Sequence, residues 1–206
     1  MLVLGINCFH ANSSVCFVEN GHVIYAMEEE RINRIKNSSG FPVLALENGL
    51  NFINKSIDDF DFIAVNNNPS SNFYSKLKFA IKNIINFPNY FHRFFFKNRN
   101  KKFNNFIKEY FPNVNLSKKL IYVEHHLSHA ISSYYLSGFE NATSVSIDGS
   151  GDFKTTALFD CDKNDLKLLK KIDYPNSLGI LYTSLTKFLG FNNYGDEYKV
   201  MGLSSY

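Results

Sequence analysis

The sequence predicts an α/β fold with a mixed sheet, and two observations support this. Short apolar runs open the chain in hairpin order, and stretches with helical spacing of apolar residues then alternate with further short runs. Three short apolar runs in a similar arrangement begin again near residue 144. This weak internal repeat predicts two lobes of the same type, the second of them incomplete within these 206 residues.

The first forty residues are expected to form three strands. Leu2 to Ile6, Ser14 to Val18 and Val23 to Met27 are apolar runs of strand length. Asn20-Gly21 lies between the second and third runs, and this dipeptide between apolar runs is a strong hairpin signal. The order predicted for these strands is therefore antiparallel.

A helix and two more strands complete the predicted first lobe, residues 1–142. Phe62 to Val65 and Leu120 to Val123 are the strands, and together with the hairpins this layout is that of a ribonuclease-H-like lobe. The helix follows Pro42, and the apolar residues expected on its core face are Val43, Leu44, Leu46, Leu50 and Ile53.

The second lobe, residues 143–206, is predicted to repeat this opening and to be truncated. Its strands are expected at Ser144 to Asp148, Thr155 to Phe159 and Leu166 to Ile172, and a helix at Ser177 to Phe191. Ligands of such two-lobed proteins bind in the cleft between the lobes.

A basic and aromatic stretch at about residues 70–115 is predicted to be a helical insert in the first lobe. Such a pattern also occurs where proteins bind single-stranded nucleic acid or an anionic membrane. We favour amphipathic helices with an aromatic core side and a solvated basic face that cap the cleft. The residues that define the stretch include Phe73, Phe79, Phe87, Phe94 to Phe96, Phe103, Phe106, Lys76, Arg93, Lys97 and Lys101.

Composition excludes several classes of protein. The chain is 45% hydrophobic and 20% charged with a net charge of +3, which excludes a strongly disordered chain. Cys8, Cys16 and Cys161 are odd in number and lack Cys-x-x-Cys spacing, which favours reduced thiols in the cytoplasm. No apolar stretch approaches the roughly 20 residues of a membrane span, and no signal peptide is recognisable, so we expect a soluble, cytoplasmic protein.

His125 and His129 form the most informative motif. On a helix, residues four apart lie on one face, so both imidazoles can reach one metal ion while His126 points about 100° away. An isolated pair with this spacing is as often a pair of ordinary surface or core histidines.

Asp148 follows an alternating run that ends in Asp148-Gly149-Ser150-Gly151. A flexible turn at the end of a strand can present a carboxylate together with bare N–H groups, so Gly149, Ser150 and Gly151 are candidates for a phosphate cradle. With the two histidines, Asp148 would complete three ligands of a metal site. The alternative is an aspartate that only forms the turn.

A dense polar segment runs from Gly195 to Leu203. Asp196, Glu197 and Lys199 place three charges within four positions, and we expect them to line the cleft. They could instead pair with one another on the surface, where such pairs contribute about 0–1 kcal/mol.

In chain order these segments resemble the O-carbamoyltransferases of the nodulation and antibiotic-tailoring type. The run from Gly195 to Leu203 is the most specific part of the resemblance. The other matching segments are Gly5-Ile6-Asn7, His10, Ser13-Ser14, Glu29-Glu30-Arg31, Arg34-Ile35-Lys36, Phe41-Pro42, His125 to Ala130 and Asp148 to Gly151.

The resemblance implies an N-terminal domain of the actin, sugar-kinase and heat-shock ATPase type, from a longer enzyme. Its metal would be iron, Fe(II), held by His125, His129, Asp148 and an aspartate beyond residue 206. A C-terminal domain, absent here, would activate carbamoyl phosphate with ATP. The partner of the reaction would be a small-molecule hydroxyl, with no role for a membrane and none expected for nucleic acid.

Further roles are predicted for side chains of the first lobe. His10 follows the first strand and is a candidate general base, with a hydrogen-bonded turn histidine as the alternative. Arg31, Arg34 and Lys36 could clamp phosphate, or form a solvated basic loop.

The sequence therefore predicts part of an O-carbamoyltransferase that transfers a carbamoyl group from carbamoyl-adenylate to a small-molecule hydroxyl, and that is inactive by itself. Two alternatives stay open. One is a tRNA threonylcarbamoyl-adenosine-type transferase, against which the segment from Gly195 to Leu203 argues. The other is a truncated, catalytically inactive remnant or binding module.

Overall fold

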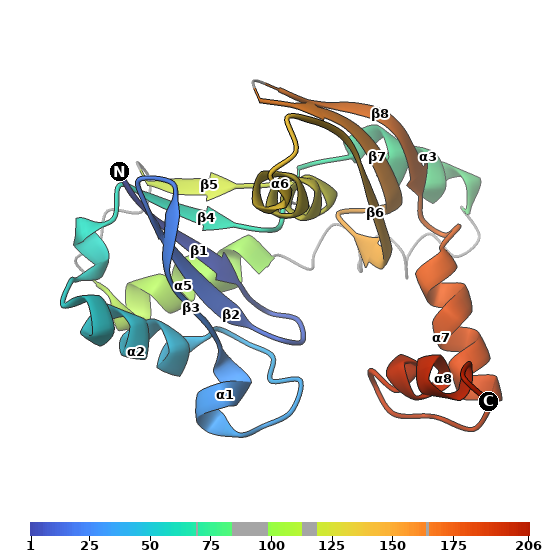
Figure 1. Cartoon of the computed structure of the whole chain (residues 1–206), viewed down its shortest axis with the longest axis horizontal. Coiled ribbons are helices and arrows are strands. Elements are labelled where there is room, and N and C mark those ends of the chain that lie inside the picture. Colours follow the sequence, from blue (N-terminus) through green and yellow to red (C-terminus); the bar gives the residue numbers. More distant parts are fainter. Residues whose placement is uncertain (69, 84–98, 113–118, 164) are drawn as a thin grey trace. The chain divides into compact units, whose positions relative to one another are not determined.

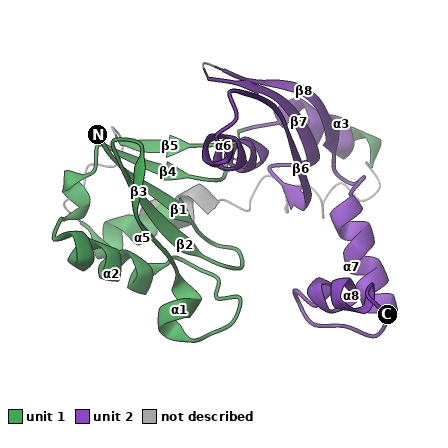
Figure 2. Cartoon of the chain, in the orientation of Figure 1, with its two compact units in different colours: residues 1–70, 80–124 green, residues 71–79, 125–206 purple. Residues whose placement is uncertain are grey.

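The computed structural model divides the chain into two compact units (Figure 2). Unit 1 comprises Met1–Ser70 and Ala80–Glu124, and unit 2 comprises Ser71–Phe79 and His125–Tyr206. The lobe boundary predicted at residues 142 and 143 lies inside unit 2. The structure describes residues 1–68, 70–83, 99–112, 119–163 and 165–206.

Unit 1 contains a five-stranded mixed sheet of order β3-β2-β1-β4-β5 (Figure 1). Its first three strands are antiparallel, whereas β1, β4 and β5 are parallel. All five strands were predicted, and their order and directions confirm the mixed sheet of a ribonuclease-H-like lobe. The strands are β1 (Leu2–Asn7), β2 (Ser14–Glu19), β3 (His22–Glu28), β4 (Phe62–Val65) and β5 (Leu120–Tyr122).

Helix α2 (Val43–Ile53) has the predicted bounds, and Val43, Leu46, Leu50 and Ile53 pack in the core as predicted. Its buried residues are Ala45, Leu46 and Gly49, whereas Leu44 is 40% exposed, so the prediction for Leu44 was wrong. Small residues face the sheet because the helix approaches it closely. A Cβ atom on Gly49 would lie 2.6 Å from the ring of Phe17, a fully buried residue of β2.

Other helices in the described part of unit 1 are α1 (Glu29–Asn33), the 3-10 helix η1 (Ile57–Asp59) and α5 (Arg99–Tyr110). In α5, Phe103 and Ile107 are buried in the core of unit 1. The core residues that they join include Leu4, Phe17, Leu46, Phe60 and Ile63.

The predicted insert is helical where the structure describes it. Phe106 of α5 stacks on Phe41, with ring centroids 5.2 Å apart, so the aromatic side of this helix is a core side. The segment Ser71–Phe79, which includes most of the first helix of the stretch, α3 (Phe73–Lys82), belongs to unit 2. Phe87, Arg93, Phe94 to Phe96 and Lys97 lie outside the described residues, as do the side chains of Arg99 and Lys101.

Unit 2 contains a three-stranded antiparallel sheet of order β6-β7-β8. Helix α6 (His125–Ser137) packs against β6 and β7 through Ala130 and Tyr134, which join Ala157, Phe159 and Cys161 in a small core. The other elements are β6 (Asn141–Gly151), β7 (Lys154–Asp162), β8 (Leu166–Asp173), α7 (Leu178–Phe188) and α8 (Glu197–Leu203).

Strand β6 continues further than the sequence predicted. The turn expected at Asp148 to Asp152 lies instead at Asp152 and Phe153, both of which have positive φ angles, 47° and 71°. Within β6 the register shifts, because Ile147 pairs with Thr156 and Gly151 with Lys154. Three residues of β6 therefore oppose one residue of β7, and such a bulge changes the direction of the side chains that it carries.

Among the described residues, no helix combines the length and apolar character that crossing a bilayer requires. Cys8, Cys16 and Cys161 all lie in the described part of the chain, and no disulfide joins them. Cys8 and Cys161 are buried.

Candidate metal centre

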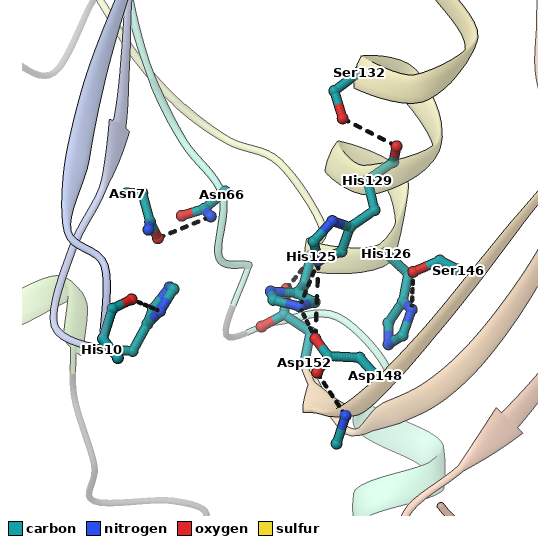
Figure 3. Close-up of polar contacts among 12 residues, drawn as sticks. Asn7, His10, Asn66, His125, His126, His129, Ser132, Ser146, Asp148 and Asp152 are labelled. Atoms are coloured by element: carbon teal, nitrogen blue, oxygen red, sulfur yellow. Dashed lines mark hydrogen bonds and ion pairs between the residues drawn. The ribbon is translucent and has the colours of Figure 1, made fainter. Parts of the chain in front are cut away.

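Helix α6 brings His125 and His129 to one face, as their spacing predicts. The Nε2 atoms of the two rings are 3.1 Å apart (Figure 3). His126 lies on another face, where it is fully buried and its Nδ1 is 2.8 Å from Ser146 Oγ of β6. His126 thus holds the helix on the sheet, while its two neighbours on the same helix point to a common place.

The bulge in β6 places the carboxylate of Asp148 at the same point. Asp148 Oδ2 is 2.6 Å from His125 Nε2 and 3.8 Å from His129 Nε2. One ligand atom from each of the three residues lies within 4.8 Å of the others (Figure 3). Helix α6 and strand β6 are both in unit 2, so this cluster lies within a single unit.

The two histidines also lower the pKa of Asp148. The hydrogen bond from His125, followed by that from His129, holds the pKa of the Asp148 carboxyl far below its ordinary value, although partial burial opposes this effect. The carboxylate is ionised at neutral pH, as an ordinary aspartate is, and stays ionised at lower pH than an ordinary aspartate. Two imidazoles and one carboxylate form a donor set typical of Zn²⁺ or Fe(II), with further coordination positions open.

Two residues after the bulge hold His125 in place. A Cβ atom at Gly151 would overlap the His125 ring, so glycine leaves the space that this ring fills. The carboxylate of Asp152 accepts a hydrogen bond from the backbone N–H of His125, at 2.9 Å. Sequence reasoning assigned no role to Asp152, because the strand register and not the spacing along the chain brings it to the start of α6.

The predicted phosphate cradle at Gly149, Ser150 and Gly151 forms hydrogen bonds with neighbouring residues through Gly149. The N–H of Gly149 donates to the Asp148 carboxylate, while the Ser177 hydroxyl is 3.0 Å from the Asp148 carbonyl oxygen and 2.8 Å from that of Gly149. Ser177 also caps α7, accepting from the N–H of Ile180. The start of α7 is thereby fixed to the bulge.

The charged residues of the last segment bond to one another and to α7. Lys199 Nζ is 2.7 Å from Asp196 Oδ1, the pairing that the sequence left open as an alternative. This hydrogen bond lowers the pKa of Asp196 and raises that of Lys199. Glu197 accepts a hydrogen bond of 2.6 Å from the hydroxyl of Thr183.

The other predicted site residues belong to unit 1. His10 is half-buried in the loop after β1, and its Nδ1 is 3.1 Å from the carbonyl oxygen of Ala11. Arg31 is 65% exposed and forms an ion pair with Glu28 at 3.4 Å. Arg34 and Lys36 are exposed.

An asparagine pair that sequence reasoning missed lies at the carboxyl ends of two parallel strands. The side-chain amide of Asn66, after β4, donates to the side-chain oxygen of Asn7, at the end of β1, at 3.0 Å (Figure 3). Asn7 also donates to the carbonyl oxygen of Asn12 at 2.8 Å, which ties the loop after β1 to the strand ends.

The segment Glu29-Glu30-Arg31 proves to contain a structural carboxylate. Glu29 is buried, and its two oxygens accept the backbone N–H groups of Leu44 and Ala45 at 3.2 and 2.8 Å. These donors lie in the first turn of α2, whose N-cap residue, Pro42, provides no side-chain hydrogen bond. Glu29 therefore caps α2 from a distance.

Comparison with known proteins shows the family of this chain. A family model described as the carbamoyltransferase N-terminus matches residues 2–206. The chain belongs to this family. Among its relatives are nodulation protein NolNO of Sinorhizobium fredii, 32% identical over 97% of this chain, and an uncharacterised protein of Synechocystis, 30% identical over 99%.

These relatives are much longer than the chain described here. The chain spans 28% of the length of the nodulation protein and 34% of the Synechocystis protein, or about a third of the curated relatives that it matches. Among solved structures, YeaZ from Pseudomonas aeruginosa aligns with 85% of this chain and 68% of its own, at 11% identity and a TM-score of 0.43.

Proposed function

We propose that this chain forms the metal-binding part of an O-carbamoyltransferase, which transfers a carbamoyl group from carbamoyl-adenylate to a hydroxyl of a small molecule. The observation that carries the proposal is the convergence of His125, His129 and Asp148 within a chain of this family. In the reaction, the acceptor oxygen bonds to the carbamoyl carbon, and the bond from that carbon to the phosphate oxygen breaks, releasing AMP.

The three converging residues would hold one divalent metal ion, Fe(II) by family resemblance. Bound there, the ion would supply Lewis-acid polarisation of the carbamoyl-adenylate. Asp148 fits this role because its carboxylate, an anionic oxygen donor, lies 2.6 Å from His125 Nε2 and 3.8 Å from His129 Nε2. His125 fits because Gly151 leaves the space that its ring fills, with Nε2 directed at Asp148.

We assign the remaining steps to the other residues that the sequence singled out. His10 would take the proton that the acceptor hydroxyl loses. N–H groups at Ser150 and Gly151 would bind phosphate oxygens, as would Arg31 and Lys36. The segment with Asp196, Glu197 and Lys199 would border the substrate.

Activation of carbamoyl phosphate with ATP is assigned to a separate C-terminal domain, because the curated relatives are about three times as long as this chain. Units 1 and 2 would then not consume ATP without that domain. We also place the protein in the cytoplasm, since its three cysteines form no disulfide among the described residues.

Metal binding provides the direct test. Chelator-treated protein is titrated calorimetrically with Co²⁺, a spectroscopic probe for Fe(II), and His125→Ala and His129→Ala are compared with His22→Ala, which removes an exposed histidine of β3. Loss of a ligand should weaken affinity by more than the roughly 10- to 100-fold expected for an outer-shell residue. Equal affinity in all four proteins would overturn the metal site.

A further inference from the structure

The first turn of α6 is bound by the carboxylate of Asp152, which lies in the turn between β6 and β7. His125 is the first residue of α6, and its backbone N–H is one of those that a helix start leaves without an intrahelical partner. Asp152 Oδ2 accepts this N–H at 2.9 Å. A negative charge at this end of a helix is also favourable, because it complements the helix dipole.

The carboxylate of Asp152 is itself held by a well-anchored turn. The Asp152 carbonyl oxygen accepts a hydrogen bond of 2.9 Å from the side-chain amide of Asn72. Lys171 Nζ in turn donates to Asn72 Oδ1 at 3.1 Å. The next residue, Phe153, is buried, and its ring contacts those of Phe79 and Tyr174 with centroids 5.6 and 5.8 Å apart.

The same turn acts on both parts of His125. Gly151 leaves the space for the ring, and Asp152 binds the backbone N–H at the base of the same side chain. His125 Nε2 is then 2.6 Å from Asp148 Oδ2, on the strand that leads into this turn (Figure 3). Strand β6 thus supplies one ligand and sets the direction of another.

We propose that Asp152 is a positioning residue of the metal centre, whose carboxylate fixes the first turn of α6 and so aims His125 at the ligand point shared with Asp148. The inference rests on the metal site proposed above. Asp152 is not proposed as a ligand, because the oxygen Oδ2 is engaged by the helix.

A different role for Asp152 is to balance the charge of Lys76. This lysine is half-buried, which lowers its pKa, and the charge of Asp152 acts in the opposite direction. If charge balance were the whole role, loss of the lysine or of the carboxylate charge would have the same effect on metal binding. The two roles therefore predict different results for Lys76→Met and for Asp152→Asn.

The test uses Co²⁺ as the probe, with affinity from calorimetry and coordination geometry from the visible absorption spectrum. Asp152→Gly removes the carboxylate without backbone strain, because glycine tolerates the φ of 47°. We expect it to weaken Co²⁺ binding by about 10- to 100-fold, as outer-shell changes do, and to alter the spectrum. Asp152→Asn should restore both, since an amide oxygen can accept the same N–H and asparagine also tolerates this φ.

The possible failures are distinguishable. If wild-type protein binds no Co²⁺, the proposed metal function fails, and this inference fails with it. If wild type binds but Asp152→Gly has the same affinity and spectrum, the positioning role alone is wrong. Asp152→Asn as weak as Asp152→Gly, or Lys76→Met as weak as either, would overturn it in favour of charge balance.

Discussion

The imidazole ring of His125 occupies the space that a side chain at Gly151 would need. A Cβ atom on Gly151 would overlap three atoms of that ring, whereas one on Gly149 would meet nothing within 4 Å. The two glycines of the same Asp-Gly-Ser-Gly segment therefore have different roles. Gly151 is required by packing against a candidate ligand, and Gly149 lies beside open space.

Gly151→Ala should consequently displace the His125 ring and weaken metal binding. We expect a loss of about 10- to 100-fold in Co²⁺ affinity, the range for residues that orient a ligand. Gly149→Ala is the matched control, because it adds the same methyl group two residues away in the same strand and should leave Co²⁺ affinity unchanged. Calorimetric titration of both chelator-treated variants measures the difference.

A Gly151→Ala protein with wild-type affinity would show that His125 reaches the metal without this space, or that it is no ligand. Equal losses in the two variants would indicate that any added methyl group disturbs the bulge. Circular dichroism on the same samples separates local displacement from unfolding.

The acid titration of Asp148 should be displaced in the metal-free protein. The hydrogen bonds from His125 and His129 lower its pKa, so the carboxyl should stay ionised at a pH where an ordinary aspartate, with a pKa of about 3.9, is half protonated. Carbon-13 NMR of the carboxyl group, assigned with Asp148→Asn, measures this directly. A midpoint near 4 would contradict the hydrogen-bonded geometry.

The same shift has a consequence for stability. Because the folded-state pKa of Asp148 is below the unfolded value, its contribution is fully present above about pH 4. It is lost progressively as the pH falls toward the lowered pKa. Urea unfolding should therefore find Asp148→Asn less stable than wild type at pH 6, with the difference decreasing at pH 3. A difference that grows on acidification would give the opposite sign and reject the assignment.

Local sequence signals predicted the elements but not the contacts that cross between them. Asn20-Gly21 forms a left-handed turn between β2 and β3, because only a few residue types tolerate positive φ angles at both positions. The spacing of His125 and His129 was sufficient to place both rings on one face. Leu44 was assigned to the wrong face, since hydrophobicity alone cannot indicate that Gly49 allows close approach to Phe17.

The bulge and its effects could not be read from local spacing. The run through Asp148 to Asp152 reads as a turn, because its glycines and aspartates favour turns. Pairing with β7 extends β6 to Gly151 and moves the turn to Asp152 and Phe153. The hydrogen bond between Asp152 and His125 then joins residues 27 positions apart, which no periodicity indicates.

His10 is expected to act as the general base of carbamoyl transfer. The experiment combines this chain with the C-terminal region of a longer relative, ferrous iron, ATP, carbamoyl phosphate and a hydroxyl acceptor. His10→Ala should lower the transfer rate by about 10²- to 10⁴-fold, the usual contribution of general base catalysis. His22→Ala, at an exposed position of β3, is the control. An unchanged rate for His10→Ala would remove His10 from the mechanism.

Glu29 should stabilise unit 1 as a remote cap of α2. Its carboxylate accepts the N–H groups of Leu44 and Ala45 in the first turn of that helix, so Glu29→Ala leaves one part-buried and one buried donor without their acceptor. We expect the free energy of unfolding to fall by about 1–3 kcal/mol, between the loss of a cap and the loss of charged hydrogen bonds.

Two variants separate capping from other causes of that loss. Glu29→Gln keeps one acceptor oxygen and should lose less stability than Glu29→Ala. Glu47→Ala removes an exposed glutamate from α2 itself and should change stability by less than about 0.5 kcal/mol. Urea unfolding of the three variants, with fluorescence of the tyrosines as the signal, measures the order. If Glu29→Ala and Glu47→Ala were equally mild, the first turn of α2 would have to be satisfied by water, and the Glu29-Glu30-Arg31 segment would need another explanation.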